Sequence, residues 1–208
     1  MTDNFKAYKQ FITEKWSYSD LPVVDSYFVV ELIRRGKDNP DMPAANYHFK
    51  NYYIRKPEDI DKYEQEIKSL CEMLHLRAYA SVNIKSFKQV SLNTMAELAR
   101  RIAKNDYRKN YAVFESCSGQ YCHSKDKQWV VDLDDCKLHD EYPEIIKELI
   151  NHCEPGGDKI VTEFPTKSGV HIITLPSDRE QFAELCEEYD VKDVDIKKNH
   201  LTLLYENL

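Results

Sequence analysis

The stretch Trp129-Val-Val-Asp-Leu-Asp134 begins the part of the sequence that decides the fold class. Because side chains alternate between the two faces of a strand, it predicts one apolar face and one face that carries Asp132 and Asp134. The pattern that follows predicts a helix, two strands, a second helix and two more strands, in that order, at residues 143–153, 159–164, 169–175, 177–189, 191–196 and 201–205. The second of these helices is expected to open with the capping-box pattern Ser177-Asp-Arg-Glu180.

This order, β-α-β-β-α-β with one further strand, is typical of a ferredoxin-like or RRM-like unit. In such a unit two helices cover one face of a sheet and the other face stays open. The third and fourth strands are expected to flank the first, so that Asp132 and Asp134 lie between them.

The first half of the chain predicts its own set of elements. We expect helices at 5–16, from Pro57 onward, and around the capping-box pattern Thr94-Met-Ala-Glu97, and strands at 27–33, 47–54 and 77–84. The third helix is expected to bury one face, formed by Met95, Leu98, Ala99 and Ile102. The sequence therefore predicts an α+β protein in which an N-terminal α/β lobe, residues 1–110, packs against an RRM-like lobe, residues 111–208, as one compact unit.

Composition limits the classes of function. The chain has 208 residues, with 29 Lys and Arg against 36 Asp and Glu, and a formal net charge of -7. A net positive charge therefore cannot be what binds this protein to nucleic acid, and any such binding must use a local basic patch or metal ions. No stretch reaches the roughly 18 apolar residues of a membrane span, and the first residues lack the pattern of a secretory signal. We expect a cytoplasmic protein without a membrane partner, whose six cysteines are thiols.

Acidic and phosphate-binding side chains recur on the three strands that are expected to lie side by side. Asp132 and Asp134 share one strand face, where they repel each other unless a cation lies between them, so they suit Mg²⁺ or Mn²⁺. Asp195 lies on the fourth strand of the unit. The candidate phosphate-binding groups are Thr166, Lys167, Ser168, His171, Lys197 and Lys198. Acids on two neighbouring strands beside a phosphate-binding turn are what metal-assisted phosphoryl transfer requires.

The motifs Val-Val-Asp132-Leu-Asp134-Asp135, Lys167-Ser168-Gly-Val-His171 and Val-Asp195-Ile resemble those of the archaeo-eukaryotic primases and primase-polymerases. In that family a hydrophobic strand ends in Asp-x-Asp, a Ser-x-His follows, and a hydrophobic residue precedes a third acid. Ser168 and His171 are three positions apart here rather than two, so that Gly169 stands at the serine position. The resemblance covers mainly residues 128–205. Small proteins of this general appearance also look like ones carried by phages and mobile elements.

The resemblance implies a metal-dependent nucleotidyltransferase that adds nucleotides to a nucleic-acid 3′ end by two-metal phosphoryl transfer. It implies that Asp132, Asp134 and Asp195 hold two Mg²⁺ or Mn²⁺ ions and that His171 contacts the incoming triphosphate. The partners it implies are nucleoside triphosphates and a single-stranded or primed template. Three residues near the third N-terminal strand are candidate nucleotide or template contacts, namely Arg77, Asn83 and Lys85.

Two other functions stay open. Asp195-Ile-Lys197 has the acid-x-lysine form of a metal-dependent nuclease, with Glu163 or Asp132 as its partner acid. That alternative leaves the turn before His171 unexplained. A catalytically lapsed primase-like domain that binds nucleotides or a protein partner is the non-enzymatic alternative.

A cysteine and histidine cluster gives a weaker signal. Its members are Cys117, Cys122, His123, Cys136 and His139, and they form a candidate zinc site. Their spacing is not that of a common zinc finger or ribbon, so that zinc is the less favoured alternative. Without zinc, residues 116–126 are expected to form a surface loop.

Basic residues cluster at two places, residues 34–37 and 100–109. The second cluster is interleaved with Tyr107 and Tyr111, so that it either follows a phosphate backbone or forms a solvated helix face. Most of the fourteen tyrosines are expected in strand and helix cores rather than as stacking platforms for bases.

Overall fold

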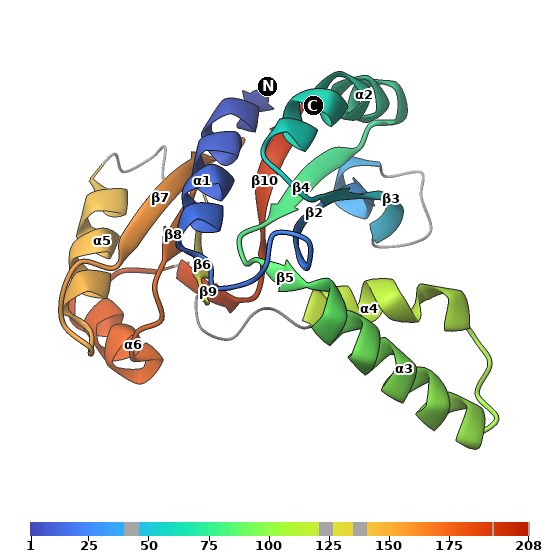
Figure 1. The fold of residues 1–208 in the computed structure, drawn as a ribbon. Coiled ribbons are helices and arrows are strands. Elements are labelled where there is room, and N and C mark those ends of the chain that lie inside the picture. The colour runs from blue at the N-terminus through green and yellow to red at the C-terminus, as the bar shows by residue number, and fades with distance from the viewer. Residues whose placement is uncertain (40–45, 121–126, 135–140, 193, 208) are drawn as a thin grey trace.

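A computed structural model of the chain describes residues 1–39, 46–120, 127–134, 141–192 and 194–207. In these residues the protein is α+β, with two antiparallel sheets and six α-helices (Figure 1). The helices are α1 (Phe5–Tyr18), α2 (Glu58–Leu74), α3 (Phe87–Ala103), α4 (Val113–Gln120), α5 (Tyr142–His152) and α6 (Arg179–Glu188), with the short 3₁₀ helices η1 (Gly36–Asp38) and η2 (Asn110–Ala112). The strands are β1 (Thr2–Asp3), β2 (Ser26–Arg35), β3 (Asn46–Ile54), β4 (Arg77–Ser81), β5 (Lys85–Ser86), β6 (Trp129–Leu133), β7 (Ile160–Pro165), β8 (Val170–Thr174), β9 (Val194–Lys198) and β10 (Leu201–Glu206).

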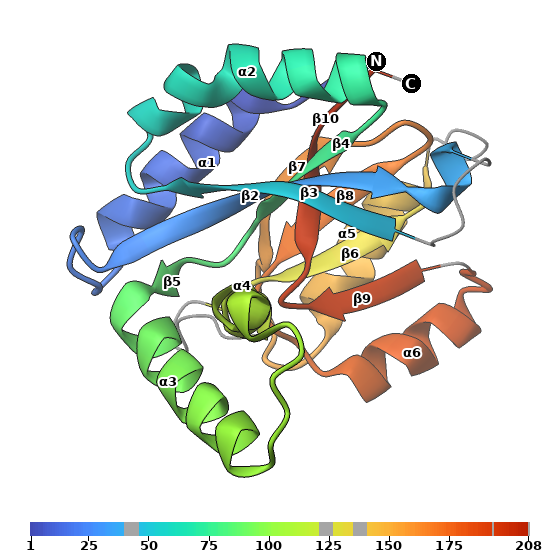
Figure 2. The same ribbon diagram turned by 90° about the vertical axis from the view of Figure 1, so that its right-hand side faces the viewer.

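The larger sheet has the strand order β1-β10-β4-β2-β3, with β5 paired to the start of β2. Helices α1 and α2 lie over one face of this sheet (Figure 2). Phe28, Val30 and Leu32 occupy alternate positions of β2 and are fully buried, because this face of the strand packs into the core beneath the two helices. The side chains at the intervening positions of β2, among them Ile33 and Arg35, point to the opposite face.

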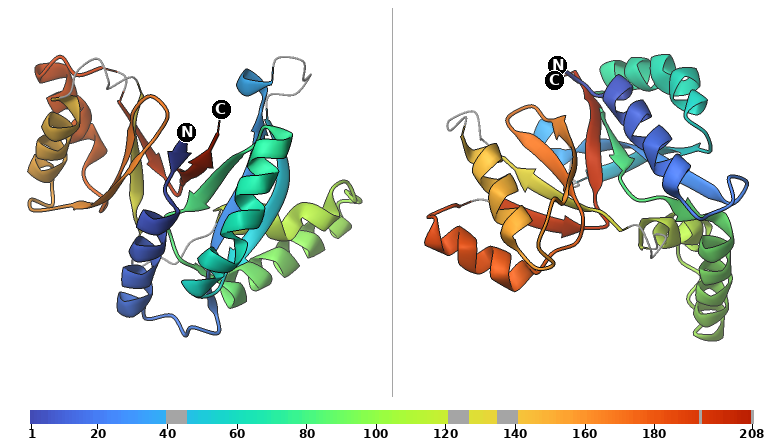
Figure 3. Two further views of the ribbon diagram at one scale, coloured as in Figure 1. Left: turned by 90° about the horizontal axis from the view of Figure 1, so that it is seen from above. Right: turned by 60° about the vertical axis from the view of Figure 1, so that its left-hand side comes forward.

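The smaller sheet has the strand order β7-β8-β6-β9, and helices α5 and α6 cover one of its faces (Figure 3). Strands β8 and β9 flank β6, as the sequence predicted. Trp129, Val131 and Leu133 point to the helices and pack in one core with Ile146 and Ile150 of α5. The face that carries Asp132 is therefore turned away from the helices.

The two sheets meet through one shared core. Val130 and Ile173, which lie on the same face of the smaller sheet as Asp132, belong to the core of the larger sheet. The Phe164 ring of β7 lies 5.8 Å from the Phe11 ring of α1, centroid to centroid. The Asn4 side-chain amide donates 2.9 Å hydrogen bonds to Pro165 O of β7 and to Leu203 O of β10. One end of the interface between the sheets is thus apolar, and polar side chains line the other end.

Strand β10 decides how the two halves of the chain are joined. The sequence division at residue 110 assigns it to the C-terminal lobe, whereas it lies in the larger sheet, between β1 and β4. The apolar stretch Leu203–Tyr205 is buried there. The last strand therefore completes the sheet that the N-terminal half begins.

Helices α3 and α4 differ most from what the sequence predicted. Helix α3 begins at Phe87, with the Ser86 hydroxyl accepting a hydrogen bond from the Gln89 N–H, so that the predicted capping box lies inside the helix. The Thr94 hydroxyl donates to Val90 O in the preceding turn. Met95 is 66% exposed, so that the predicted buried face was wrong. Part of the expected loop 116–126 forms the end of α4.

Smaller differences concern strand and helix ends. The strand expected at 77–84 ends at Ser81, and a separate short strand, β5, follows. The cap of α6 is Asp178 rather than Ser177, because the Asp178 carboxylate accepts hydrogen bonds from the N–H groups of Glu180 and Gln181. Cys71 and Cys153 are buried free thiols. No helix among the described residues combines the length and the apolar character needed to cross a membrane.

Candidate active site

A cleft of about 340 Å³ lies between the polar parts of the two sheets. The smaller sheet and the turns at its ends contribute Asp132, Asp134, Thr166, Lys167, Ser168, His171, Lys197 and His200. The larger sheet and η1 contribute Ile33, Arg35, Lys37, Asn46, Arg77, Tyr79, Leu201 and Leu203. Most of the residues that the sequence singled out therefore line one cavity.

The register of the smaller sheet brings three of the predicted residues to one level. Asp132 of β6 is directly opposite His171 of β8 on one side and Asp195 of β9 on the other. Residues directly opposite in an antiparallel pair point to the same face, with Cβ atoms about 4.5–5.5 Å apart. The three side chains thus form a row on one face of the sheet, in which Asp132 and His171 line the cleft and Asp195 lies beyond its lining.

Asp132 is the centre of this row. Its Oδ2 lies 2.6 Å from Lys197 Nζ, and its Oδ1 lies 3.3 Å from His171 Nε2. The side chain is only 17% exposed. The hydrogen bond with His171, and then that with Lys197, hold the pKa of Asp132 well below its usual range, although partial burial acts in the opposite direction. Asp132 is therefore a carboxylate across the whole physiological pH range.

His171 connects the two sheets. Its buried ring places Nδ1 3.3 Å from the Leu203 backbone nitrogen, which donates to it, and 3.1 Å from Thr202 Oγ1. Because Nδ1 accepts this backbone hydrogen bond, the ring proton lies on Nε2, which faces Asp132. Strand β10 thus fixes the orientation of a histidine that belongs to the other sheet.

Lys197 lies between two carboxylates. Its Nζ is 2.6 Å from Asp132 Oδ2 and 3.6 Å from Asp195 Oδ2. Burial lowers the pKa of Lys197, but the hydrogen bond and charge of Asp132, and then the charges of Asp195 and Asp134, raise it by more. The row of side chains therefore already holds one positive charge between its acids.

The acids suit a divalent cation in their chemistry. Asp132, Asp134 and Asp195 supply the carboxylate oxygens that Mg²⁺ and Mn²⁺ prefer, and the position of the Lys197 ammonium shows that the space between two of them attracts a cation. Within the described part of the chain, no three histidine, cysteine, aspartate or glutamate side chains form a group that could hold a metal ion. Asp195 is also 64% exposed. The three carboxylates are therefore suitable ligands for Mg²⁺ or Mn²⁺, and in this structure the Lys197 ammonium offsets part of their negative charge.

The turn between β7 and β8 is closed by its own hydrogen bonds. The Thr166 N–H donates to Gly169 O at 2.9 Å, and the Gly169 N–H donates to Thr166 Oγ1 at 3.0 Å. The Thr166 hydroxyl, which was predicted to bind phosphate, thus accepts a hydrogen bond within the turn itself. Lys167 and Ser168, at the tip of this turn, line the cleft.

The opposite wall of the cleft is basic. Arg35 and Lys37 belong to the cluster at residues 34–37 that the sequence shows, although they were not predicted as site residues. The Arg35 Nη1 donates to the Tyr79 hydroxyl at 3.1 Å, which fixes both side chains on the sheet. This wall faces the acids of β6 and the lysine of the β7–β8 turn.

Arg77, a predicted nucleotide contact, lines the cleft but is held by two acids, Asp38 and Glu206. Its Nε and Nη2 donate to the two Asp38 oxygens at 2.7 and 2.8 Å, and its Nη1 lies 2.9 Å from Glu206 Oε2. Glu206 is fully buried. Arg77 is therefore a structural link between β4, η1 and β10 as well as a part of the wall.

Four other predicted residues are not among the residues that line the cleft, and one of them is Asp195, the predicted third metal ligand. Asn83 is buried and bonds both ways with the Gln128 backbone, and Lys85 is buried with its Nζ donating to Ser118 O. Lys198 points to the helical face, where its Nζ lies 5.0 Å from the centre of the Trp129 ring. Asn83 and Lys85 therefore connect neighbouring segments of the chain through buried hydrogen bonds and do not line the site.

The candidate zinc ligands are only partly described. Cys117 is 5% exposed and packs in the core between α3, α4 and β2. The other four, Cys122, His123, Cys136 and His139, lie outside the described residues, as does Asp135.

No family model, no curated protein and no solved structure matches this chain. The interpretation of the cleft therefore depends on its own residues.

Proposed function

We propose that this protein is a metal-dependent nucleotidyltransferase of the primase-polymerase type, which adds nucleotides to a nucleic-acid 3′ end. The observation that carries the proposal is the row His171–Asp132–Asp195 on adjacent strands, in which His171 and Asp132 face a basic wall across one cleft. A bound triphosphate requires two kinds of side chain: carboxylates that hold its metal ions, and basic groups that neutralise its phosphates. In a chain with a net charge of -7, the basic side chains of the cleft are a local exception.

The topology of the smaller sheet supports the same proposal. Its element order β6-α5-β7-β8-α6-β9 and strand order β7-β8-β6-β9, with both helices on one face, are consistent with a ferredoxin-like unit and support the proposal. We infer that this unit is the RRM-like catalytic lobe, whose open face is the wall with Asp132. Fold alone does not give the function, so that the proposal rests on the side chains.

Each wall of the cleft has its own role in the proposed reaction. Asp132, Asp134 and Asp195 would hold Mg²⁺ or Mn²⁺, which when bound neutralises phosphate charge and activates a 3′-hydroxyl. Lys167 and Ser168 would bind the phosphates, with Arg35 and Lys37 facing them. Lys197 would offset negative charge as the phosphoryl group transfers.

The direct test is incorporation of a labelled nucleotide on a primed template by the full chain with Mn²⁺ or Mg²⁺. The expected result is a longer primer with the wild-type protein and none above background with Asp132→Asn. No product from DNA or RNA templates, primed or unprimed, with either metal and either ribo- or deoxynucleotides would overturn the proposal.

A metal-dependent nuclease is the second candidate, because Asp195 and Lys197 share a face and Lys197 contacts Asp132. The other proposed partner acid, Glu163, points to the helical side of β7 and forms an ion pair with Lys147 of α5. Shortening of a labelled oligonucleotide in the same reaction, without synthesis, would assign the cleft to cleavage. Nucleotide binding without either reaction would assign it to a catalytically lapsed domain.

A further inference from the structure

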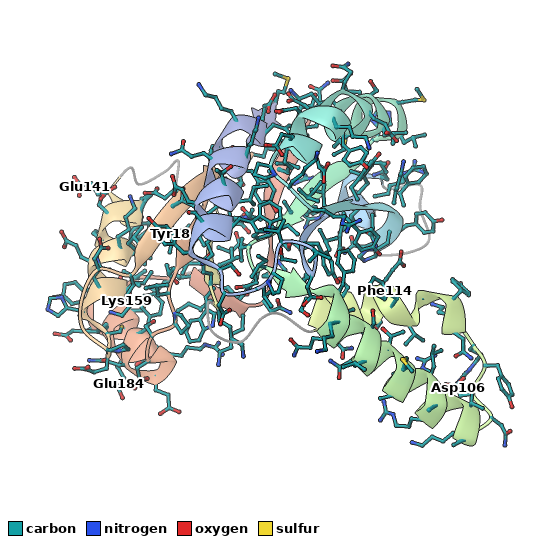
Figure 4. All side chains as sticks on the ribbon, viewed as in Figure 1. Tyr18, Asp106, Phe114, Glu141, Lys159 and Glu184 are labelled. Atoms are coloured by element: carbon teal, nitrogen blue, oxygen red, sulfur yellow. The ribbon has the colours of Figure 1, made fainter. Side chains whose placement is uncertain are left out.

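Helix α3, residues 104–112 and helix α4 form an arm that extends away from both sheets (Figures 1 and 3). Its base is fixed, because Val90, Val113 and Cys117 pack with Tyr27 and Val29 of β2. The outer part of the arm, residues 100–111, has no such core, and we call it the arm tip. Figure 4 shows Asp106 at this outer end.

The arm tip is strongly basic. It carries five bases and one acid, namely Arg100, Arg101, Lys104, Arg108 and Lys109 against Asp106. Arg100 and Arg101 pair with Glu97, and Arg108 pairs with Asp106. Exposed pairs of this kind contribute little free energy, so that an arginine can exchange its partner for a phosphate at low cost. Lys104 and Lys109 are also exposed.

Two aromatic rings lie among these charges. Tyr107 is 62% exposed and Tyr111 is 87% exposed, whereas Tyr8, Tyr27 and Tyr205 are almost completely buried. The sequence predicted that most tyrosines belong to the cores, and these two do not. Exposed rings beside a basic track are the combination that binds single strands, because bases stack on the rings and phosphates meet the charges.

The base of the arm contacts the turn after β9, which is next to residues that line the cleft. The Asn199 side-chain amide donates to Gly119 O at 2.6 Å and to Gln120 O at 3.2 Å, at the end of α4. Its neighbours Lys197 and His200 line the cleft. Helix α3, which carries the start of the arm tip at its far end, has 17 residues and spans about 25 Å at 1.5 Å per residue. A strand bound at the arm tip and following the arm to its base would run toward β9 and these cleft-lining residues.

We propose that the arm tip binds single-stranded nucleic acid, through stacking on Tyr107 and Tyr111 and through the charges of Lys104 and Lys109. This binding does not require the cleft to catalyse any reaction. Only its use, to guide a template strand along α4 into the cleft, rests on the proposed function.

The stacking test uses the anisotropy of a fluorescent thymidine oligonucleotide of about 12 nucleotides, within the range of single-strand site sizes. The double variant Tyr107→Ala/Tyr111→Ala is expected to bind about tenfold more weakly or worse. The matched control is Tyr18→Ala/Tyr189→Ala, since these rings are 84% and 60% exposed and lie outside the arm and the cleft. The control is expected to bind like the wild type, and equal affinity of the arm variant and the control would overturn the proposal.

The charge test uses the same probe at several salt concentrations. In Lys104→Ala/Lys109→Ala the slope of log affinity against log salt is expected to fall by about two, one for each lost phosphate contact. Lys6→Ala/Lys56→Ala, two exposed lysines near α1 and α2, serves as the control and should keep the wild-type slope. An unchanged slope in the arm variant would contradict phosphate contact at the tip and leave this surface to a protein partner.

The two proposals fail separately. If Asp132→Asn loses incorporation yet still binds the oligonucleotide in a way that depends on Tyr107 and Tyr111, both proposals are supported. If the wild type incorporates nothing but the arm variant still weakens binding, only the proposed function fails. If incorporation occurs and the arm variant binds like the wild type, only the proposal for the arm tip fails.

Discussion

The two walls of the cleft are built in different ways. The wall from the smaller sheet is built on cross-strand register, which places Asp132 directly opposite His171 and Asp195 on adjacent strands, and Asp132 and His171 line the cleft. The wall from the larger sheet is basic, and its buried arginine, Arg77, is held by Asp38 and Glu206 from outside the strand that carries it. The first wall comes from local alternation along strands, and the second from charges that distant segments hold in place.

This difference separates function from stability. A charge on the first wall is partly accessible in the cleft and can meet a ligand, so that its loss should mainly affect chemistry. Arg77 is 7% exposed, with its partners buried beside it, so that its loss should mainly affect folding. Substitutions on the two walls therefore provide a direct test of the comparison.

The largest expected effect is on activity and comes from Asp132→Asn. If the carboxylate holds a catalytic ion, losing several kcal/mol of charge stabilisation lowers the incorporation rate about a thousandfold or more, at tenfold per 1.36 kcal/mol. The control, Glu184→Gln, removes one exposed negative charge from α6 and should leave the rate unchanged. Steady-state incorporation on a primed template measures both variants, and a fall of less than tenfold for Asp132→Asn would contradict the assigned role.

The next effect is on stability and comes from Arg77→Met. Removing one partner from a buried charge cluster leaves Asp38 and Glu206 uncompensated, and costs about 3–5 kcal/mol in the free energy of unfolding. Denaturant unfolding should show this loss, and the triple change with Asp38→Asn and Glu206→Gln should recover much of it. Arg100→Met, at a 65% exposed side chain, is the control and should cost less than about 0.5 kcal/mol. A similar small cost for Arg77→Met would show that the second wall does not depend on this cluster.

A smaller effect is expected from two adjacent lysines on opposite faces of β9. Lys197→Ala removes the cation from Asp132 and should lower the incorporation rate roughly tenfold or more. Lys198→Ala removes only the contact with the Trp129 ring, worth no more than about 1 kcal/mol of stability, and should leave the rate within about twofold. The incorporation rates of the two variants are measured under the same conditions. An equal loss of rate in both variants would contradict the placement of Lys197 and Lys198 on opposite faces of β9.

The smallest effect is the pH dependence of stability. The pKa of Asp132 is lowered in the folded protein, first by His171 and then by Lys197. The carboxylate therefore stabilises the fold above the unfolded value of about 4, and this contribution is lost as the pH falls through the lower folded value. Charge-assisted hydrogen bonds of this kind contribute about 1–3 kcal/mol. The free energy of unfolding of the wild type should exceed that of Asp132→Asn at pH 7 and pH 5, with the gap closing below pH 4; a gap independent of pH would contradict the assignment.

The local sequence pattern was sufficient to predict the strand arrangement of the smaller sheet. Alternation along residues 129–134 placed Asp132 opposite the helices, and the order of elements placed β8 and β9 on its two sides. Capping patterns were less reliable, because Thr94 matched a capping box but lies within α3, which Ser86 caps. A cap depends on where the chain leaves the sheet, and a four-residue pattern does not contain that information.

The sequence by itself determined which acids share a strand face, because the two-residue period of a strand is local and needs no knowledge of the rest of the fold. Only the tertiary structure decided that β10 returns to the larger sheet, that its backbone orients His171, and that Arg35 and Lys37 face Asp132 across a cleft. These are contacts between residues far apart in the chain, set by which buried surfaces fit together. The periodicity of a single segment does not indicate which distant segment it will pack against.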